Sequence, residues 1–396
     1  MAPAYTGADA YLCYGIGGGG GSSITKLVAN DAAFAGIDAQ SGGVIAFGSA
    51  AHGGNLSDLA RFGRKQISLS SGVSRVVASA GAFAALNGSG SVYAWGSLFA
   101  GGGVSTWTRP DLVNITSLTA TRTAFAALTS TGNVVTFGDK YGGGDSSAVA
   151  AQLNQNNVYH ILGAQSVFVA FRRNDSVVVW GNSYYGGDAS AVASQLVHGD
   201  GSSAVQSVAY TAAAFAALKF DGTVVTWGKS GFGGDSSAVQ STLTSVVAVY
   251  STHSAFAALK ADGSVAWGDA KNGGEIPVAG ATASKLSSGV TAIYATRRAF
   301  AALKAPAGEV VLWGSMYHGG DADATTTTTT TPGAGSSTAG TILLLSSGVV
   351  RLCSNDVAFT AVKSDGSAVV WGHAASIPFP GVLDTPVSLI NATCSS

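Results

Sequence analysis

The sequence predicts an all-β protein, a β-propeller of seven to eight four-stranded blades, on three observations. An Ala-Phe-Ala-Ala-Leu motif recurs, a Val-x-x-Trp-Gly motif follows each copy, and successive copies lie 41 to 59 residues apart. That period is typical of a four-stranded propeller blade. The phenylalanine position of the eight copies is occupied by Phe34, Phe83, Phe125, Phe168, Phe215, Phe256, Phe300 and Phe359. The aromatic position before glycine is occupied by Phe47, Trp95, Phe137, Trp180, Trp227, Trp267, Trp313 and Trp371.

The copy at residues 245–270 illustrates how each strand and turn of the repeat is predicted from the sequence. Its β-branched run 245–250 favours a first strand, and the apolar run 255–259 favours a second. The Asp-Gly pair within 260–263 favours the positive φ that a tight hairpin turn needs. Residues 264–267 then form a third strand, and the glycines after Trp267 end it. A weaker fourth segment precedes the next copy.

The copies account for nearly the whole chain, so residues 1–396 are predicted to be one propeller domain. We count eight units and expect the two chain ends to share a blade and close the ring. Residues 11–15 and 387–390 are the strand-like pieces at these ends. Closure would remove exposed sheet edges. Seven blades with an accessory segment is the alternative.

The aromatic side chains of the repeat are interpreted as core rather than as a cofactor site. Alanine on both sides of each phenylalanine lets neighbouring blades approach closely. Each aromatic ring then buries about 150–250 Å² between blades. Residues that differ among the copies therefore carry the functional information.

Charge and hydropathy exclude several classes of partner. The chain has 20 Lys and Arg against 21 Asp and Glu, a net charge of −1, and only 10% charged residues. A nucleic-acid surface or docking to anionic lipid needs clustered basic residues, so neither is expected. No run of 18 apolar residues predicts a membrane span, and residues 1–21 do not read as a signal peptide.

The sequence offers no catalytic set, so we expect no enzyme activity and no cofactor. The glycine run 17–21 lacks the Lys-Ser/Thr ending of a phosphate-binding loop. The six histidines show no ligand spacing. The Gly-Gly-Asp turns supply one carboxylate per repeat, whereas calcium needs several converging oxygens. These aspartates are predicted to cap turns instead.

The residues above resemble the regulator of chromosome condensation repeat. The run 289–295, the Ala-Phe-Ala-Ala-Leu stretch 299–303 and the Val-Val-Leu-Trp-Gly stretch 310–314 reproduce its pattern in order. The resemblance covers residues 10–390 and implies a propeller, most often seven-bladed. The repeat is also similar in style to the secreted β-lactamase-inhibitor protein II, which binds its target through loops on one face.

Two departures separate this chain from that family. The family's Gly-Gln-Leu-Gly is replaced by Gly-Gly-Asp at Asp145, Asp188, Asp235 and Asp321. The family's frequent histidine before the second strand is mostly absent. Chromatin binding and nucleotide exchange are therefore not expected here.

The loop between Trp-Gly and Gly-Gly differs from copy to copy and supplies the candidate binding residues. Equivalent loops of successive blades should lie on the same face and form an aromatic rim, which suits a protein or a glycan. The alternative is that the rings fold back over the blade edge. The candidates are His52, Phe99, Tyr141, Tyr184, Tyr185, Phe232, Tyr317 and His318.

A second polar ring precedes each phenylalanine and is expected to lie at the mouth of the central channel. The adjacent pair Arg297 and Arg298 hints at an anion site, but a solvated rim is the favoured interpretation. The ring holds Asp31, Arg122, Gln165, His253, Arg297, Arg298 and Asp356.

Possible modification sites favour an extracellular glycoprotein. A Thr-rich segment, residues 325–338, is predicted to be an inserted mobile loop that resembles an O-glycosylated patch. Its candidate O-glycosylation sites are Thr325, Thr326, Thr327, Thr328, Thr329, Thr330 and Thr331. N-glycosylation sequons begin at Asn55, Asn87, Asn114, Asn174 and Asn391. Among three cysteines, a disulfide between Cys13 and Cys394 is the candidate, because a closed ring brings the ends together; three reduced thiols is the alternative.

These observations favour a non-enzymatic extracellular propeller with a structural or adhesive role. It would assemble with itself or with a surface protein through its loop faces. The first alternative is a soluble ligand-binding propeller, a lectin or protein inhibitor that uses the aromatic rim. The second is an intracellular, cytoplasmic regulator of the chromosome-condensation type.

Overall fold

The computed structural model describes residues 24–56, 69–104, 109–196, 205–276, 282–320, 328–331, 334–337 and 344–373. The chain divides into two compact units. The N-terminal unit is Thr6–Ser202, and the C-terminal unit is Ser203–Ser396 together with Met1–Tyr5. Ring closure and a single domain over 1–396 stay predictions.

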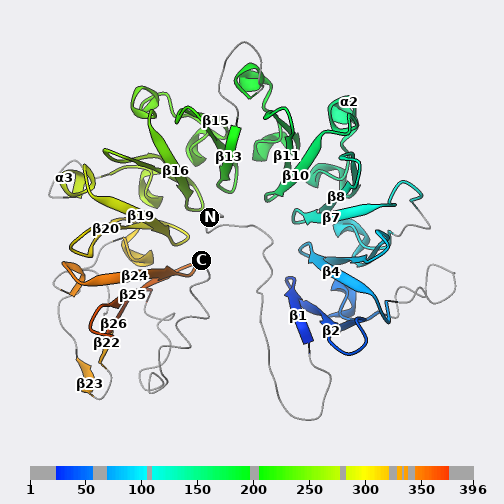
Figure 1. Cartoon of the computed structure of the whole chain (residues 1–396), viewed down its shortest axis with the longest axis horizontal. Helices are drawn as coiled ribbons and strands as arrows, with labels where there is room; N and C mark the ends of the chain where they lie inside the picture. Colours follow the sequence, from blue (N-terminus) through cyan, green and yellow to red (C-terminus); the bar gives the residue numbers. More distant parts are fainter. Residues whose placement is uncertain are drawn as a thin grey trace. The chain divides into compact units, whose positions relative to one another are not determined.

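The N-terminal unit holds four antiparallel three-stranded sheets in chain order (Figure 1). Each sheet uses one copy of the repeat, with the Ala-Phe-Ala-Ala-Leu stretch as its central strand. The strands are β1 (Ile24–Ala29), β2 (Ala33–Asp38), β3 (Val44–Gly48), β4 (Val73–Ala78), β5 (Ala82–Asn87), β6 (Val92–Gly96), β7 (Ile115–Ala120), β8 (Ala124–Thr129), β9 (Val134–Gly138), β10 (Val158–Gly163), β11 (Val167–Arg172) and β12 (Val177–Gly181).

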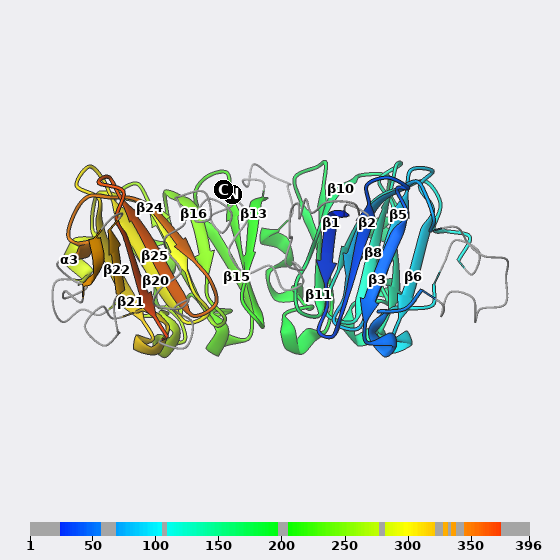
Figure 2. The same ribbon diagram turned by 90° about the horizontal axis from the view of Figure 1, so that it is seen from below.

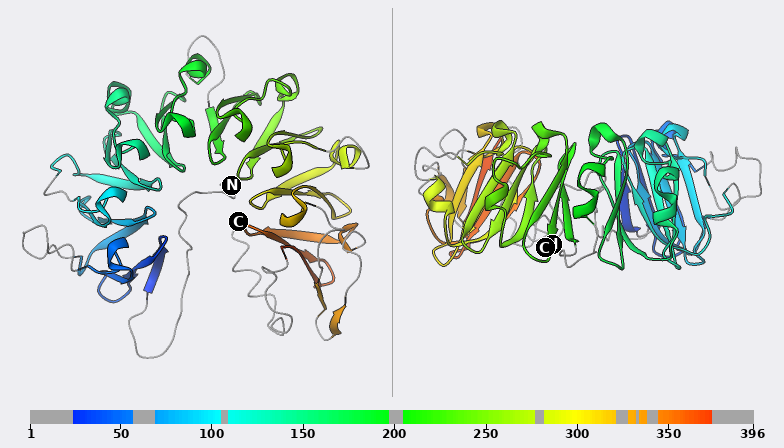
Figure 3. Two further views of the ribbon diagram at one scale, coloured as in Figure 1. Left: turned by 180° about the vertical axis from the view of Figure 1, so that it is seen from behind. Right: turned by 90° about the horizontal axis from the view of Figure 1, so that it is seen from above.

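The C-terminal unit holds four more antiparallel sheets, three of three strands and a last one of five (Figure 3). A short helix, α2 (Ala150–Leu153), lies in the N-terminal unit, and α3 (Thr282–Leu286) lies in the C-terminal one. The strands are β13 (Val205–Tyr210), β14 (Ala214–Lys219), β15 (Val224–Gly228), β16 (Val246–Ser251), β17 (Ala255–Lys260), β18 (Gly263–Gly268), β19 (Val290–Ala295), β20 (Ala299–Lys304), β21 (Glu309–Gly314), β22 (Thr328–Thr331), β23 (Ala334–Ser337), β24 (Val349–Ser354), β25 (Ala358–Lys363) and β26 (Ala368–Gly372).

Neighbouring sheets pack a face of large aromatic side chains against a face of small alanine side chains. Between the second and third sheets, Phe125 and Phe137 of the third sheet meet Ala82 and Ala84 of the second. Leu112, from the connection between them, is fully buried in the same core. Alanine on one side leaves the volume that the aromatic rings fill, so the sequence pattern sets the packing. The sequence analysis missed the leucine position, which recurs as Leu69, Leu112, Leu153, Leu196, Leu243, Leu286 and Leu345, all buried.

The two aromatic positions of each copy stack across neighbouring strands. In the second sheet, Phe83 and Trp95 are register partners with ring centroids 5.5 Å apart. The first sheet is the exception to burial, because Phe34 and Phe47 are 41% and 43% exposed. The prediction that these positions are core is therefore confirmed for every copy except the first, whose aromatic side chains are partly exposed.

A hydrogen bond links most of these indoles to the preceding repeat. The Trp180 Nε1–H donates to the Gly143 carbonyl oxygen at 3.0 Å, and Trp95 donates to that of Gly53 at 2.8 Å. The accepting glycine ends the short turn that follows the previous sheet. Trp267, Trp313 and Trp371 make the same bond in the C-terminal unit.

Replacing Trp180 by phenylalanine should therefore lower the free energy of unfolding by about 2–3 kcal/mol, because the buried Gly143 carbonyl loses its donor and the smaller ring leaves a cavity. The ring stack would survive, because Phe137 already stacks on Phe125 at 5.2 Å in the third sheet. Urea denaturation of the Trp180→Phe variant measures the change. An unchanged midpoint would mean that the indole bond adds no stability.

Two predictions about the repeat need correction. The described residues of seven sheets form three strands rather than four. The described parts of the fourth segments form turns, and in the second sheet Gly103 and Val104 make hydrogen bonds to Ala94 at the sheet edge. The last sheet has five strands, because β22 of the Thr-rich segment pairs with β26 and with β23. That segment was expected to be a loop, but β-branched threonine suits an edge strand.

Candidate functional site

A short 3₁₀ turn follows the third strand in seven of the described sheets. In Figure 2 these turns lie along one edge of the sheets of each unit. Each turn ends at a left-handed glycine, such as Gly143 with φ 96°. The turns are η1 (Ala50–His52), η2 (Leu98–Ala100), η3 (Lys140–Gly142), η5 (Ser183–Tyr185), η7 (Ser230–Phe232), η9 (Ala270–Asn272) and η10 (Met316–His318).

The predicted rim residues occupy two different positions of this turn. Phe99, Tyr141, Tyr184 and Tyr317 stand at its middle position and are 88%, 65%, 61% and 68% exposed. His52, Tyr185, Phe232 and His318 stand at its last position and are only half-exposed. The side chains at the last position fold back as the alternative interpretation expected, whereas those at the middle position are exposed, and their role in binding stays a prediction.

The side chains at the last position pack back onto the protein. The Phe232 ring lies 5.8 Å from the His253 ring, and His52 Nδ1 shares a 3.0 Å hydrogen bond with the Ser49 hydroxyl. His318 makes the corresponding contact with Ser315 at 3.3 Å. These residues brace the turn and offer little area to a partner.

The middle position carries exposed aromatic side chains on successive turns only in the N-terminal unit. Phe99, Tyr141 and Tyr184 come from three successive turns, and Leu98 beside Phe99 is 62% exposed. We call these four residues the aromatic row. The Lys140 ammonium lies 4.7 Å from the centre of the Tyr141 ring. Tyr317 has no aromatic counterpart at the middle position of η7 or η9, where Gly231 and Lys271 stand.

A hydroxyl missed by the sequence analysis holds five of the seven turns in place. Thr252 Oγ1–H donates to the Asn272 carbonyl oxygen at 3.0 Å and accepts from the Ala255 amide at 3.1 Å. A serine or threonine at the start of the polar break before the phenylalanine is the sequence signal that would have found it. The same role falls to Ser79, Thr121, Thr211 and Thr296.

The polar breaks are joined in series by backbone hydrogen bonds. In the C-terminal unit, the His253 amide donates to Arg297 and the Arg297 amide donates to Asp356, each at 2.8 Å. In the N-terminal unit, the Arg122 guanidinium pairs with Asp31 at 3.1 Å. The predicted polar ring thus comes together along the sheets within each unit, and part of its charge is internally paired.

The surroundings of His253 disfavour its protonated form. Burial lowers the pKa of His253, and nearby Arg297 and Arg298 lower it further, while Asp269 opposes them. The folded chain therefore binds the proton less readily than the unfolded chain does.

Stability should accordingly decrease as the pH falls below about 6.5, where an unfolded histidine begins to bind its proton, towards the lowered pKa of His253. Melting temperatures measured from neutral to mildly acidic pH test this. The His253→Gln variant should flatten the dependence. An equal slope in both proteins would contradict the role of His253.

The aspartates of the Gly-Gly-Asp turns act as turn caps, as predicted. The carboxylates of Asp145, Asp188 and Asp235 each accept a hydrogen bond at 2.9 Å from the backbone amide two residues later. These bonds lower the pKa of all three carboxyls. Asp321 lies outside the described residues. Within the described part of the chain, no three His, Cys, Asp or Glu residues gather as metal ligands.

The predicted N-glycosylation sites differ in exposure. Asn55, Asn114 and Asn174 are exposed, whereas Asn87 is half-buried and its side-chain oxygen accepts from Ser89 and Ser91. Asn391 and residues 325–327 lie outside the described residues, and only the backbone of Thr328–Thr331 is described. Whether any of these sites carries a sugar stays a prediction.

The predicted disulfide is wrong in the structure. Cys353, in β24, is disulfide-bonded and buried. Since the chain has only three cysteines, Cys13 and Cys394 cannot be bonded to each other at the same time. Both of these lie outside the described residues. The sequence reasoning treated the chain ends alone and gave no role to a cysteine within a strand.

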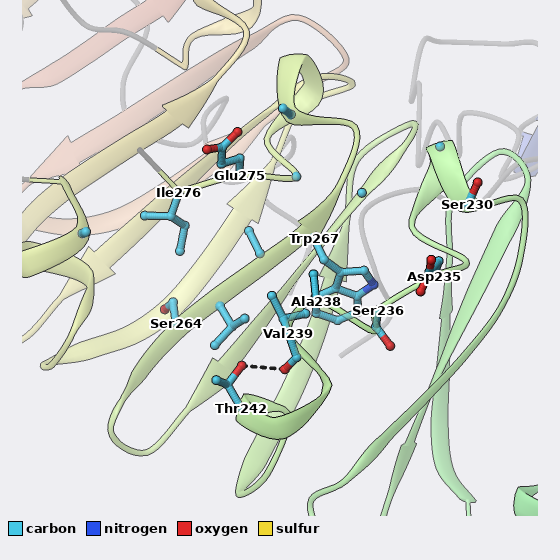
Figure 4. A pocket seen from close by; sticks show the side chains of 17 residues that line it. Ser230, Asp235, Ser236, Ala238, Val239, Thr242, Ser264, Trp267, Glu275 and Ile276 are labelled. Atoms are coloured by element: carbon cyan, nitrogen blue, oxygen red, sulfur yellow. Dashed lines mark hydrogen bonds between the residues drawn. The ribbon is translucent and has the colours of Figure 1, made fainter. Parts of the chain in front are cut away.

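The C-terminal unit contains a pocket of about 790 Å³ beside strand β18 (Figure 4). Trp267 lies at its centre in this view, with Asp235 and Glu275 on opposite sides. A second, more polar pocket of about 550 Å³ lies beside β9, next to the Arg109–Asp111 ion pair. No predicted site residue lines either pocket. The described helices include none long and apolar enough to cross a membrane.

No protein-family model and no curated protein sequence matches the chain. Several solved structures resemble the chain, but with low sequence identity and low TM-scores. The chain is 15% identical to Saccharomyces cerevisiae Prp20p, with a TM-score of 0.36, covering 88% of this chain and 82% of that one. The Arabidopsis thaliana ACR4 CRINKLY WD40 ectodomain is 14% identical with a TM-score of 0.35, and the match covers 88% of this chain and 92% of that one.

The Physcomitrella patens receptor kinase CR4 ectodomain gives 15% identity and a TM-score of 0.36, with 63% of this chain covered. The chain spans about 62% of that ectodomain's length. Prp20p binds Gsp1p and histones. Likenesses at this level show neither a family nor an activity for this chain, and the regulator of chromosome condensation repeat stays a resemblance.

Proposed function

We propose that this chain is a non-enzymatic extracellular β-propeller of eight blades that assembles with copies of itself through the aromatic row. The observation that carries the proposal is the exposure of Phe99, Tyr141 and Tyr184 on three successive turns. Exposed aromatic side chains are the usual anchors of protein interfaces. The half-buried Tyr185 ring packs edge-on against Tyr184, with ring centroids 5.2 Å apart.

The low charge of the surface favours a second copy as the partner. A net charge of −1 leaves little electrostatic repulsion between copies at neutral pH. With only 10% charged residues, little ionic hydration has to be lost when two such surfaces meet. A surface partner of similar neutral character is the alternative occupant of the row.

Two features support an extracellular location. Cys353 is disulfide-bonded, and disulfides persist mainly in oxidising compartments. Asn55, Asn114 and Asn174 start sequons and are exposed, so their side chains are open to glycosylation. Intact-mass measurement of the native protein tests this part, and an unmodified mass would remove the support from the sequons.

Sedimentation velocity of the full chain between about 1 and 100 µM tests self-assembly. We expect the mean sedimentation coefficient to rise with concentration. A single monomeric species over the whole range would overturn self-assembly. If that monomer bound sugars on a glycan array through the same row, the ligand-binding alternative would replace it.

A further inference from the structure

The outer strand of the sixth sheet, β18, has an unpaired edge among the described residues. In the second sheet, the Ala94 amide donates to Val104 at 2.6 Å and the Ala94 carbonyl accepts from Gly103 at 3.0 Å. Ala266 occupies the same register position, because it faces Ala257 as Ala94 faces Ala84. The backbone groups of Ala266 therefore point away from β17, yet they make no such bond in the described part of the chain.

The backbone amide of Ser264, two residues before Ala266, also lacks a hydrogen-bond partner among the described residues. Its counterparts Val44 and Val177 donate their amides to Leu69 and Leu196, at 2.7 and 3.2 Å. Within the described residues, the Ser264 amide has no such partner, and its side-chain Oγ is buried without a hydrogen-bond partner. Unpaired buried polar groups are costly, so an edge like this favours a ligand that can pair with it.

The pocket in Figure 4 runs along this edge. Val239, Val265 and Ile276 supply an apolar lining, and the carboxylates of Asp235 and Glu275 stand at its two sides. No basic side chain is among the lining residues. The site therefore combines a row of backbone donors and acceptors with apolar walls and negative charge.

We propose that an extended peptide segment of a partner protein binds here as a fourth strand of the sixth sheet. Its backbone would pair with Ser264 and Ala266, small apolar side chains would enter the pocket, and a lysine or arginine would pair with Glu275. Strand addition of this kind takes affinity from the backbone and specificity from the side-chain pockets. In the last sheet, β22 already pairs in this antiparallel manner with the equivalent strand β26.

Amide hydrogen exchange of the full chain is the first test. The amides of Ser264 and Ala266 should exchange rapidly, while those of Ala94 and Val177, which are hydrogen-bonded, should be protected. Protection of Ser264 and Ala266 in the free chain would overturn the proposal, because it would mean that the chain itself fills the edge.

The second test uses the acetylated and amidated peptide Lys-Val-Ala-Val-Lys as the probe. We expect it to slow exchange at Ser264 and Ala266 at about 1 mM or below. Two N-methylated versions of the peptide carry the methyl groups on opposite sets of alternate residues. The version whose methylated nitrogens face β18 should bind at least tenfold more weakly, and the other should bind as before. No slowing of exchange, or equal binding by both methylated peptides, would overturn strand addition.

The charge of the occupant is tested by Glu275→Gln, which should weaken binding of the lysine peptide several-fold. Asp262→Asn removes one negative charge from the same sheet outside the pocket and should leave binding unchanged. Equal effects of the two variants would contradict a specific pairing with Glu275. The proposal concerns the C-terminal unit and does not depend on the aromatic row.

Discussion

Replacing Gly233 by alanine should lower the free energy of unfolding by about 2–4 kcal/mol. Gly233 ends turn η7 with φ 92°, and a Cβ there would lie 2.6 Å from Cδ2 of Phe256. The Phe256 ring cannot move aside, because it is fully buried and stacks on Trp267 at 5.3 Å. Backbone strain and steric overlap therefore add.

Gly231, two residues earlier in the same turn, provides the matched control. A Cβ at Gly231 would meet no atom within 4 Å, and its φ is not positive. The Gly231→Ala variant should therefore be neutral or slightly stabilised. Chemical denaturation of the two variants side by side tests the expectation, and similar midpoints would contradict the close contact between the turn and Phe256.

Replacing Phe99, Tyr141 and Tyr184 together by serine should weaken self-association at least about 100-fold, since interface aromatics commonly contribute more than 1 kcal/mol each. The fold should be unaffected, because all three side chains are largely exposed. Sedimentation velocity measures the association, and thermal unfolding checks that stability is unchanged.

Phe220 supplies the control for a general loss of surface hydrophobicity. It is 66% exposed and stands in the hairpin between β14 and β15, outside the turns that carry the row. Phe220→Ser should leave association unchanged. Association that survives in the triple variant, or that is lost equally in Phe220→Ser, would contradict the role of the aromatic row.

Much of the fold could be predicted because the repeat encodes it locally. The strand pattern around Phe256 and Trp267, the hairpin turn at Asp262 and the capping role of Asp235 all follow from residue type and spacing. Their causes act over a few residues, so one copy of the motif is enough to reveal them. The number of strands per sheet was harder to predict, because a fourth strand needs an edge partner that local pattern does not specify.

The candidate site could be predicted only in part. The sequence located the variable turns but did not separate Tyr184, which is exposed, from Tyr185, which is half-buried. Adjacent residues with the same side chain have the same chemistry, and only the direction of the 3₁₀ turn distinguishes them. The pocket beside β18 was not predicted at all, because it depends on backbone groups that every residue has.

The sequence by itself determined that the chain is a repeated all-β array whose Phe and Trp positions form the core in every copy but the first, since periodic apolar residues mark the buried face of each repeat. Only the tertiary structure decided which aromatics are exposed, that Cys353 is disulfide-bonded, and that the backbone groups of Ser264 and Ala266 have no partner among the described residues. These properties depend on contacts between residues far apart in the chain, and no local pattern records them.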